Sequence, residues 1–410
     1  MKADKLQFWS WVVYDISDTV FSLLIVTLLY AVYFKEVVFS SSPNGDLAWG
    51  ISVSASILIV SIISPVLGAL ADYSGLKKRF LGIATFSCAL FTSALYFVKR
   101  GDIFSGILFF ILAYISFALC LTFYNAFLIE IADRDKIGKA SGIGWAAGYA
   151  GAMVILLFLY PLIKDGFAEH NLRNIRYCFL LVAICCIVFS IPALIFLREK
   201  KPLTERENKS LLKIGMSRVY ETLIKVKNYK NLSLFLIAYF FYNDGITTVI
   251  VFSSIYASST LKFSMQELLI FFISIQVTAV IGSFLLGYVI DMIGAKKVIL
   301  VTLFIWCAVV IGAYMTKERI YFYIIGMIAG FAMGSSQAAS RSLMGLFTPE
   351  DRSAEFFGFF SLCGKVSGII GPTAFGLISS GTGNQRLAIL SVLIFFIAGL
   401  VLMVKVKEPG

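Results

Sequence analysis

Four ionisable side chains lie inside long apolar runs of this chain, where burial is costly unless the group faces water or a partner. Asp15 and Asp18 are three residues apart in the first run, Asp244 lies near the middle of a later run, and Lys365 lies well inside another. A charge within a membrane span costs several kcal/mol unless it serves a cavity or an ion pair. We therefore expect these four residues to line a cavity that binds a polar solute or carries protons.

Each of the four also has a structural explanation. Asp15 and Asp18 share one helical face near the end of their run, where ordinary solvation could suffice. Asp244 could form a buried pair with Lys365 or Arg341 that only holds helices together. Lys365 could instead bind a substrate carboxylate, or extend its ammonium to the membrane interface. The residue types alone leave these alternatives open.

Neutral polar and aromatic side chains in other apolar runs extend the candidate substrate and coupling set. They are Asn125, Tyr149, Tyr242, Asn243, Gln276 and Gln337. Tyr149 lies beside the glycine series Gly142, Gly144, Gly148 and Gly151, whose spacing is typical of a close helix-packing face. The single histidine, His170, falls in a loop, so a proton-coupled mechanism would need a carboxylate such as Asp15 or Asp244.

The elements that carry these residues are membrane helices. The chain has 410 residues, of which 59% are hydrophobic and 14% charged, against about 25% charged in soluble domains. At about 20 residues a span, the runs predict twelve helices, and an even number places both termini on one side. The predicted helices are 9–34, 47–71, 80–98, 103–130, 140–163, 177–197, 232–258, 267–290, 298–316, 320–345, 355–380 and 386–404.

The positive charges predict the orientation. With the N-terminus inside, 24 of the 35 Lys and Arg residues fall in inner segments, so we expect cytoplasmic termini in the cell (inner) membrane. The net charge of +11 then reflects topology and not a nucleic-acid partner. We expect six-helix bundles at 1–197 and 232–410, joined by a basic cytoplasmic connector at 198–231. Part of that connector has the spacing of an amphipathic helix, which would lie along the inner membrane surface. A flexible linker is equally consistent with its sequence.

Several function classes are excluded by what the sequence lacks. All seven cysteines lie in apolar runs without a C-x-x-C pair, and there is one histidine, so neither a disulfide framework nor a metal site is expected. No Walker-type phosphate-binding motif is present, which argues against ATP-driven pumping. We expect no cofactor and no enzymatic activity, and a monomer in the lipid bilayer.

A polar loop occurs twice, after the second helix of each predicted half. Its two copies are Gly68-x-x-x-Asp72-x-x-Gly75-x-Lys77-Lys78 and Gly287-x-x-x-Asp291-x-x-Gly294-x-Lys296-Lys297. The first glycine lets helices approach closely, and the second permits a tight turn. The aspartate can contact the positive N-terminal end of a neighbouring helix, while the basic pair stays in the cytoplasm. Tyr14-Asp15 and Tyr242-Asn243-Asp244 form a second repeat, in the lead helices.

Further charged residues near the helix ends are candidates for an inner gate. Glu130 would join Arg134 or Lys139. Arg341 would pair with Glu350 or Glu355, or would bind substrate.

The repeated loop resembles the signature of the major facilitator superfamily, although Tyr73, Leu76, Met292 and Ala295 depart from it. Within that superfamily the chain is similar to the vacuole-effluxer family related to the autophagy-linked vacuolar amino-acid exporter. The blocks that carry the likeness are Trp11 to Asp15, Tyr124 to Leu128, Ser141 to Gly151, Tyr242 to Thr248, Gln337 to Ser342, and Ala354 through Pro372. Ile129 stands where that family often has proline.

The resemblance implies an all-α integral membrane fold of two pseudo-symmetric six-helix bundles. It implies a secondary transporter working by alternating access, with its site at the interface of the two halves. We expect the substrate to be a small polar organic solute and favour amino-acid efflux, with protons as a candidate coupling ion. The alternatives are proton-coupled multidrug efflux and a non-transporting membrane receptor on a carrier fold.

Overall fold

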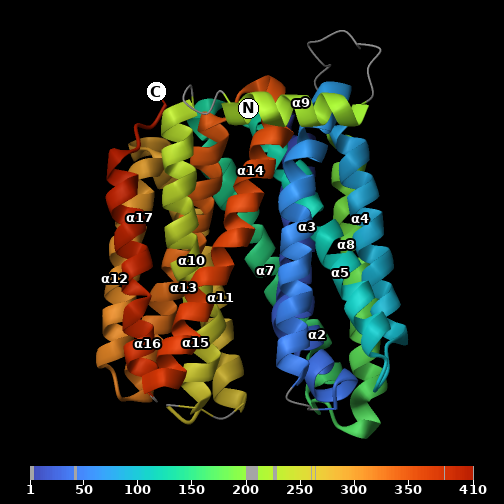
Figure 1. Ribbon diagram of the computed structural model, residues 1–410, viewed down its shortest axis with the longest axis vertical. Helices are drawn as coiled ribbons and strands as arrows, with labels where there is room; N and C mark the ends of the chain where they lie inside the picture. Colours follow the sequence, from blue (N-terminus) through green and yellow to red (C-terminus); the bar gives the residue numbers. More distant parts are fainter. Residues whose placement is uncertain are drawn as a thin grey trace. The chain divides into compact units, whose positions relative to one another are not determined.

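The computed structural model describes residues 4–40, 44–199, 211–224, 229–259, 261–263, 265–382 and 384–409. Within these ranges, 12 helical stretches are long and apolar enough to cross a membrane. The prediction of twelve spans is therefore confirmed. Figure 1 shows the helices, with colours that follow the chain from blue at the N-terminus to red at the C-terminus.

The helices form two compact units. The first comprises Met1–Ile131, Ala147–Val219 and Glu350–Ser361, and the second comprises Ala132–Ala146, Tyr220–Pro349 and Leu362–Gly410. Each unit thus includes a short segment from the other half of the sequence. The domain division at residues 197 and 231 stays a prediction.

In the first unit, α3, α4, α5 and α8 run side by side (Figure 1). Their bounds are Asn44–Ser74, Lys77–Ala94, Ile103–Ala126 and Leu172–Phe196. A long apolar stretch becomes a helix in lipid because only a helix satisfies its own backbone hydrogen bonds there. The first helix packs against α8 along much of its length.

That first helix is longer and less regular than the predicted 9–34. Its α-helical parts, α1 (Lys5–Phe21) and α2 (Leu29–Tyr33), alternate with π-helical turns at Ser22–Leu28 and Phe34–Val38. At the end of the first of these turns the Leu29 N–H donates to the Leu24 carbonyl five residues earlier, which is the π-helical spacing. Such turns are often found at functional sites.

The fourth membrane helix is interrupted although Ile129 replaces a proline. Helix α5 ends at Ala126, and the short helix α6 (Leu128–Ile131) follows. At the junction the Phe127 N–H donates to the Tyr124 carbonyl at 3.1 Å. A 3-10 turn at Arg134–Lys136 follows, and helix α7 (Ile137–Ile163) begins after it.

The second unit contains most of α10 to α17, although α14 up to Ser361 belongs to the first unit. Their bounds are Lys230–Ser259, Met265–Ile293, Ala295–Met315, Arg319–Phe347, Ser353–Val366, Ile370–Thr382, Gln385–Ser391 and Leu393–Lys405.

Helices α11 and α13 pack through small residues. A Cβ on Gly282 would lie 2.3 Å from the Phe331 carbonyl oxygen, and one on Gly334 would lie 2.2 Å from that of Ala279. Close backbone packing of this kind is typical of membrane helices.

The eleventh span breaks inside the predicted helix 355–380. A 3-10 turn at Ser367–Ile369, with Gly368 at non-helical angles, separates α14 from α15. The run Gly364, Gly368 and Gly371 before Pro372 explains the break, since these residues favour or force an interrupted helix.

The connector contains a helix, α9, at Leu211–Ile224. Met216, Tyr220 and Ile224 follow one another every four residues and are 63%, 65% and 61% exposed, so one apolar stripe faces away from the protein. A flexible linker is therefore wrong for this segment. Residues 200–210 and 225–228 of the predicted connector lie outside the described residues.

Candidate functional site

The first copy of the repeated loop clamps the start of a helix. Asp72, at the end of α3, accepts hydrogen bonds from the Ala354 N–H at 3.1 Å and the Glu355 N–H at 2.9 Å. These N–H groups belong to the first turn of α14, which has no helical acceptors for them. A Cβ on Gly68 would lie 2.2 Å from the Ala354 carbonyl oxygen. The predicted roles of this glycine and aspartate, close approach and contact with a helix N-terminus, are both confirmed.

The Asp72 clamp includes a buried ion cluster. The Lys77 ammonium lies 3.5 Å from Asp72 Oδ1, forms a hydrogen-bonded ion pair with Glu130, and donates to the Ser353 hydroxyl at 2.8 Å. Lys77, Asp72 and Glu130 are only 5%, 8% and 8% exposed.

Two expectations about this cluster are wrong. Lys77 is buried and does not extend into the cytoplasm, and Glu130 pairs with Lys77 and not with Arg134 or Lys139. The break at Phe127 turns α6 so that Glu130 reaches the first residue of α4. Sequence spacing cannot reveal that turn.

The second copy of the loop clamps α7 in the same way. Asp291, at the end of α11, accepts from the Gly138 N–H at 2.7 Å and the Lys139 N–H at 2.9 Å. A Cβ on Gly287 would meet Gly142 Cα at 2.9 Å, which confirms the predicted close-packing role of these two glycines. The Lys139 ammonium lies over the Tyr288 ring, 4.7 Å from its centre.

The turn glycines of both copies adopt the left-handed conformation. Gly75 has φ of 63° and Gly294 has φ of 96°. Residues with a side chain rarely adopt such backbone angles, so glycine is required for the tight turn between the two helices.

Two glutamates that support these loops were missed by the sequence analysis. Glu199, just after α8, accepts the Lys78 backbone N–H, while the Lys78 ammonium donates to the carbonyls of Ile195 and Leu197 at 3.0 Å and 2.9 Å. The glutamate therefore caps the first turn of α4 and ties it to the end of α8.

The second unit repeats this cap. Glu408 accepts the N–H groups of Ala295 at 2.8 Å and Lys296 at 3.1 Å, and the Lys296 ammonium donates to the Val404 carbonyl at 2.9 Å. The signal was present in the sequence, because Leu197-Arg198-Glu199 and Val406-Lys407-Glu408 both follow the last helix of a half.

In the second unit, the break in the eleventh span holds the buried carboxylate of Asp244. Both Asp244 oxygens accept the Gly371 N–H at 2.9 Å, at the first turn of α15. Asp244 is 0% exposed, so this hydrogen bond replaces lost solvation. The donor is thus a backbone amide and not the Lys365 ammonium, which excludes the simple pairing of Asp244 with Lys365.

The neighbouring Asn243 joins the same break. Its amide donates to the Gly364 carbonyl at 3.0 Å and to the Ser367 hydroxyl at 2.7 Å. Lys365, next to Gly364, is half-buried. The structure therefore brings Asn243 and Asp244 of α10 to the stretch of the eleventh span that carries Lys365.

Two polar residues of α13, Ser340 and Arg341, form hydrogen bonds with other helices. The Tyr242 hydroxyl is hydrogen-bonded to Ser340 at 2.7 Å. The buried Arg341 guanidinium donates to the Ser141 hydroxyl at 2.9 Å and carbonyl at 2.7 Å, and lies 5.1 Å from the centre of the Trp145 ring. Arg341 thus binds the start of α7 through hydrogen bonds and a cation–π contact.

In the first unit, the candidate residues lie around α1. Asp15 and Asp18 are 2% and 6% exposed, so solvation does not explain either of them. Tyr124 stacks between Trp11 and Tyr14, with ring centres 4.8 Å apart on each side.

The remaining candidates have different degrees of burial. Tyr149 is buried, whereas Asn125, Gln276 and Gln337 are partly exposed on α5, α11 and α13. Their role in binding stays a prediction.

Comparison with known proteins identifies relatives along the whole chain. The family described as "Vacuole effluxer Atg22 like" matches residues 50–138 and 130–409. An MFS-type transporter of Bacillus subtilis, YxiO, is 28% identical over 415 residues, covering 100% of this chain and 96% of that protein. Autophagy-related protein 22 of Kluyveromyces lactis is 27% identical over 284 residues, covering 65% of this chain, which spans 57% of that relative's length.

Solved structures match the fold. The human organic anion transporter MFSD10 has a TM-score of 0.74 at 13% identity, with 98% of this chain and 99% of that chain covered. The Escherichia coli fucose:proton symporter FucP has a TM-score of 0.71 at 12% identity, with 98% of both chains covered. The predicted major facilitator fold is confirmed. The family match and the relatives show a multipass integral membrane transporter and not an enzyme.

Proposed function

Since the chain belongs to the Atg22-like vacuole effluxer family, we propose that it is a secondary active transporter that exports small polar organic solutes, with amino acids as the first class to test. Transport as such follows from the family and the fold. The solute class and the direction are our proposal.

The solute class is inferred from the charged residues at the break in the eleventh span. The Asp244 carboxylate is held by the Gly371 N–H, and its neighbour Asn243 contacts the Gly364 carbonyl, next to Lys365. An acid and a base at the same break suit a solute that carries both an ammonium and a carboxylate. In other carriers, substrate sites lie at discontinuous membrane helices of this kind.

The two clamps support alternating access. Asp72 holds the first turn of α14 and Asp291 holds the first turn of α7, so each unit binds a helix end from the other half of the sequence. In each clamp a carboxylate accepts two backbone hydrogen bonds, and a hydrogen bond to a charged group contributes about 1.5–3 kcal/mol. Contacts of that strength can form and release within a transport cycle.

We further propose that the clamps lie at the cytoplasmic side of the cell membrane, with both termini. The support is the excess of Lys and Arg in the segments on that side, according to the positive-inside rule. The basic α9 connector would then lie along the inner surface.

Uptake and counterflow in proteoliposomes test the function. Purified protein is reconstituted and offered a panel of labelled amino acids, sugars and cationic drugs, with and without a pH gradient. We expect exchange of amino acids, lost in both Asp244→Asn and Lys365→Gln. The control Asp165→Asn removes an exposed loop carboxylate and should transport normally.

Other outcomes would contradict the proposal in distinct ways. Transport of drugs without amino acids would assign multidrug efflux. Failure to move any solute would favour a non-transporting receptor. Amino-acid exchange that survives in both variants would separate the solute site from the eleventh span.

A further inference from the structure

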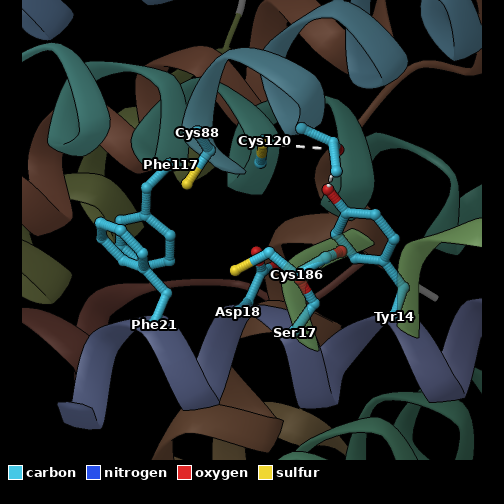
Figure 2. A pocket seen from close by; sticks show the side chains of 9 residues that line it. Tyr14, Ser17, Asp18, Phe21, Cys88, Phe117, Cys120 and Cys186 are labelled. Atoms are coloured by element: carbon cyan, nitrogen blue, oxygen red, sulfur yellow. Dashed lines mark hydrogen bonds between the residues drawn. The ribbon is translucent and has the colours of Figure 1, made fainter. Parts of the chain in front are cut away.

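The helices of the first unit leave little space between them. Helices α1, α4, α5 and α8 enclose a small cavity, which Cys88, Cys120 and Cys186 line together with six other residues (Figure 2). Its volume is about 10 Å³, close to what one water molecule requires. A larger ligand does not fit there, so a site for one must lie at the ends or on the outer faces of these helices.

At one end of the same helices, two arginines are held by two tyrosines. The Arg173 Nε and Nη2 atoms donate to the Tyr177 hydroxyl, one turn later on α8, at 3.1 Å and 2.9 Å. The Arg176 guanidinium lies 5.6 Å from the centre of the Tyr96 ring, in the 3-10 turn Leu95–Phe97 that follows α4. The two tyrosine rings are 5.4 Å apart. These four side chains therefore form one group, the Arg–Tyr cluster.

The nearby carboxylates are bonded to other groups. Glu169 forms an ion pair with Arg100 at 2.6 Å, and Asp102 accepts a backbone N–H at 2.8 Å. In the part of the chain that the structure describes, Arg173 and Arg176 contact tyrosines and form no ion pair. The cluster thus holds two guanidinium groups in place without a carboxylate to balance their charge.

An arginine of the second unit provides a contrast. Arg319, at the start of α13, donates to the Glu267 carboxylate at 2.9 Å and to the carbonyls of Leu261 and Lys262 at 3.0 Å and 2.9 Å. That arginine fastens a loop to a helix, and its charge is balanced by an acid. The Arg–Tyr cluster has the fixed geometry without the balancing acid.

Neither helix stability nor topology explains two arginines at this place. Arg173 lies in the first turn of α8, which contains no acidic residue, and the positive end of a helix dipole disfavours cations. In the orientation proposed above, the cluster lies on the outer side of the membrane, where Lys and Arg are less common. An anion that binds from outside the protein would offset both costs.

The cluster lies where membrane spans end. The third span is Lys77–Phe97 and the sixth is Glu169–Phe196, and the two pack against each other. The Phe97 ring is 5.3 Å from that of Tyr96 and is 69% exposed, so an apolar ring faces outward next to the charged groups. A phospholipid has the same arrangement, because its phosphate is joined to apolar acyl chains.

We propose that the Arg–Tyr cluster binds the phosphodiester headgroup of an anionic phospholipid. Guanidinium groups donate paired hydrogen bonds that match phosphate oxygens. A headgroup with net negative charge, such as that of phosphatidylglycerol, balances the arginines, whereas a zwitterionic headgroup brings an ammonium of its own. The tyrosines already hold the guanidinium groups, so less side-chain entropy is lost on binding. This lipid site goes beyond the proposed function and does not depend on which solute is transported.

Lipid binding to the purified full-length protein is the direct test. Protein in a non-ionic detergent is titrated with phosphatidylglycerol or phosphatidylcholine, and native mass spectrometry counts the bound lipids. We expect a saturable site for phosphatidylglycerol that phosphatidylcholine does not fill. The double variant Arg173→Gln and Arg176→Gln should bind at least about tenfold more weakly, since one lost hydrogen bond to a charged group corresponds to roughly that factor. Unchanged affinity in the double variant, or equal binding of phosphatidylcholine, would overturn the proposal.

Two further proteins separate this site from general attraction between charges. The matched control, Lys164→Gln with Lys317→Gln, removes two charges from exposed loop positions outside the cluster and should bind phosphatidylglycerol as the wild type does. An equal loss in this control would contradict a specific site. Tyr177→Phe keeps every charge but removes the hydroxyl that holds Arg173, and it should also weaken binding. Unchanged affinity there would refute the role of the tyrosine, and this variant keeps the test decisive if the double variant does not fold.

The source of the phosphate group is tested by competition. Inorganic phosphate and glycerophosphoglycerol, which is the headgroup without acyl chains, are added at the same concentration as the lipid. We expect neither to displace phosphatidylglycerol, and displacement by either would overturn the lipid assignment in favour of a soluble anion. Elution as a single species in size-exclusion chromatography, without added lipid, checks the folding of each variant. Because no transport is measured, the result stands even if the proposed function fails.

Discussion

The carboxylate of Asp244 accepts the backbone N–H of Gly371 with both of its oxygens, at 2.9 Å each. The contact needs glycine, because a Cβ at position 371 would lie 2.1 Å from the Thr248 hydroxyl oxygen and 2.8 Å from Asp244 Oδ1. A helix start and a buried acid are thus fitted to each other without space for one more carbon atom.

We expect Gly371→Ala to destabilise the protein and reduce transport. Placing a methyl group into this contact is an overpacking change that costs about 1–3 kcal/mol. The matched control is Gly376→Ala in the same helix, where a Cβ would meet nothing within 4 Å and helix propensity favours alanine by about 1 kcal/mol. Thermal melting in detergent should rank the proteins Gly376→Ala, wild type, Gly371→Ala. Equal melting temperatures for the two variants would mean that the contact is not tight.

The clamps lead to a kinetic prediction. Asp72→Asn and Asp291→Asn should slow transport with little change in KM, because both carboxylates bind helix ends and not solute. Loss of such a cap, about 0.5–2 kcal/mol, changes the balance between clamped and released states by roughly tenfold. Asp72→Asn should slow transport more than Asp291→Asn, since Asp72 also lies 3.5 Å from the buried Lys77 ammonium. Initial rates across solute concentrations measure this, and a raised KM at constant maximal rate would contradict it.

Removing either glutamate cap should lower stability in its own unit. Glu199→Ala and Glu408→Ala each leave N–H groups of a first helical turn without their acceptor, at a cost of about 1 kcal/mol and about 2–4 °C in melting temperature. Glu318→Ala is the control, because Glu318 precedes α13 without a side-chain capping bond. A loss as large in the control would show that capping is not the cause.

Glu199 also predicts a pH dependence. Burial disfavours its charge more than the Lys78 N–H bond favours it, so the pKa of this carboxyl is raised above its usual range. The proton stabilises the folded state: this contribution is complete below the unfolded pKa of about 4.3 and is lost as pH rises through the folded value. Relative to Glu199→Gln, the melting temperature of the wild type should therefore fall as pH is raised from 4 to 7. A difference that is constant or grows with pH would refute this.

The proposed orientation predicts which side chains reagents can reach. In a cysteine-free background, Tyr220→Cys on the exposed stripe of α9 should react with a membrane-impermeant thiol reagent only after the cells are opened. His170→Cys, in the loop between the fifth and sixth spans, should react in intact cells. The reverse pattern would place the termini outside.

Much of the architecture follows from the sequence because its causes are local. Twelve apolar runs become helices since lipid offers the backbone no other hydrogen-bonding partners. The repeated loop indicates two related halves, and its glycines and aspartates do what their spacing predicts, as Gly68 with Asp72 and Gly287 with Asp291 illustrate.

The partners of the buried charges are decided only by the tertiary structure. Glu130 pairs with Lys77, and Asp244 with the Gly371 N–H, although residues closer in sequence or opposite in charge offered other choices. Which partner a side chain meets depends on the rotation of its helix and on breaks such as those at Phe127 and Gly368. These are set by the packing of all neighbouring helices together, and a single run of residues carries no record of that packing.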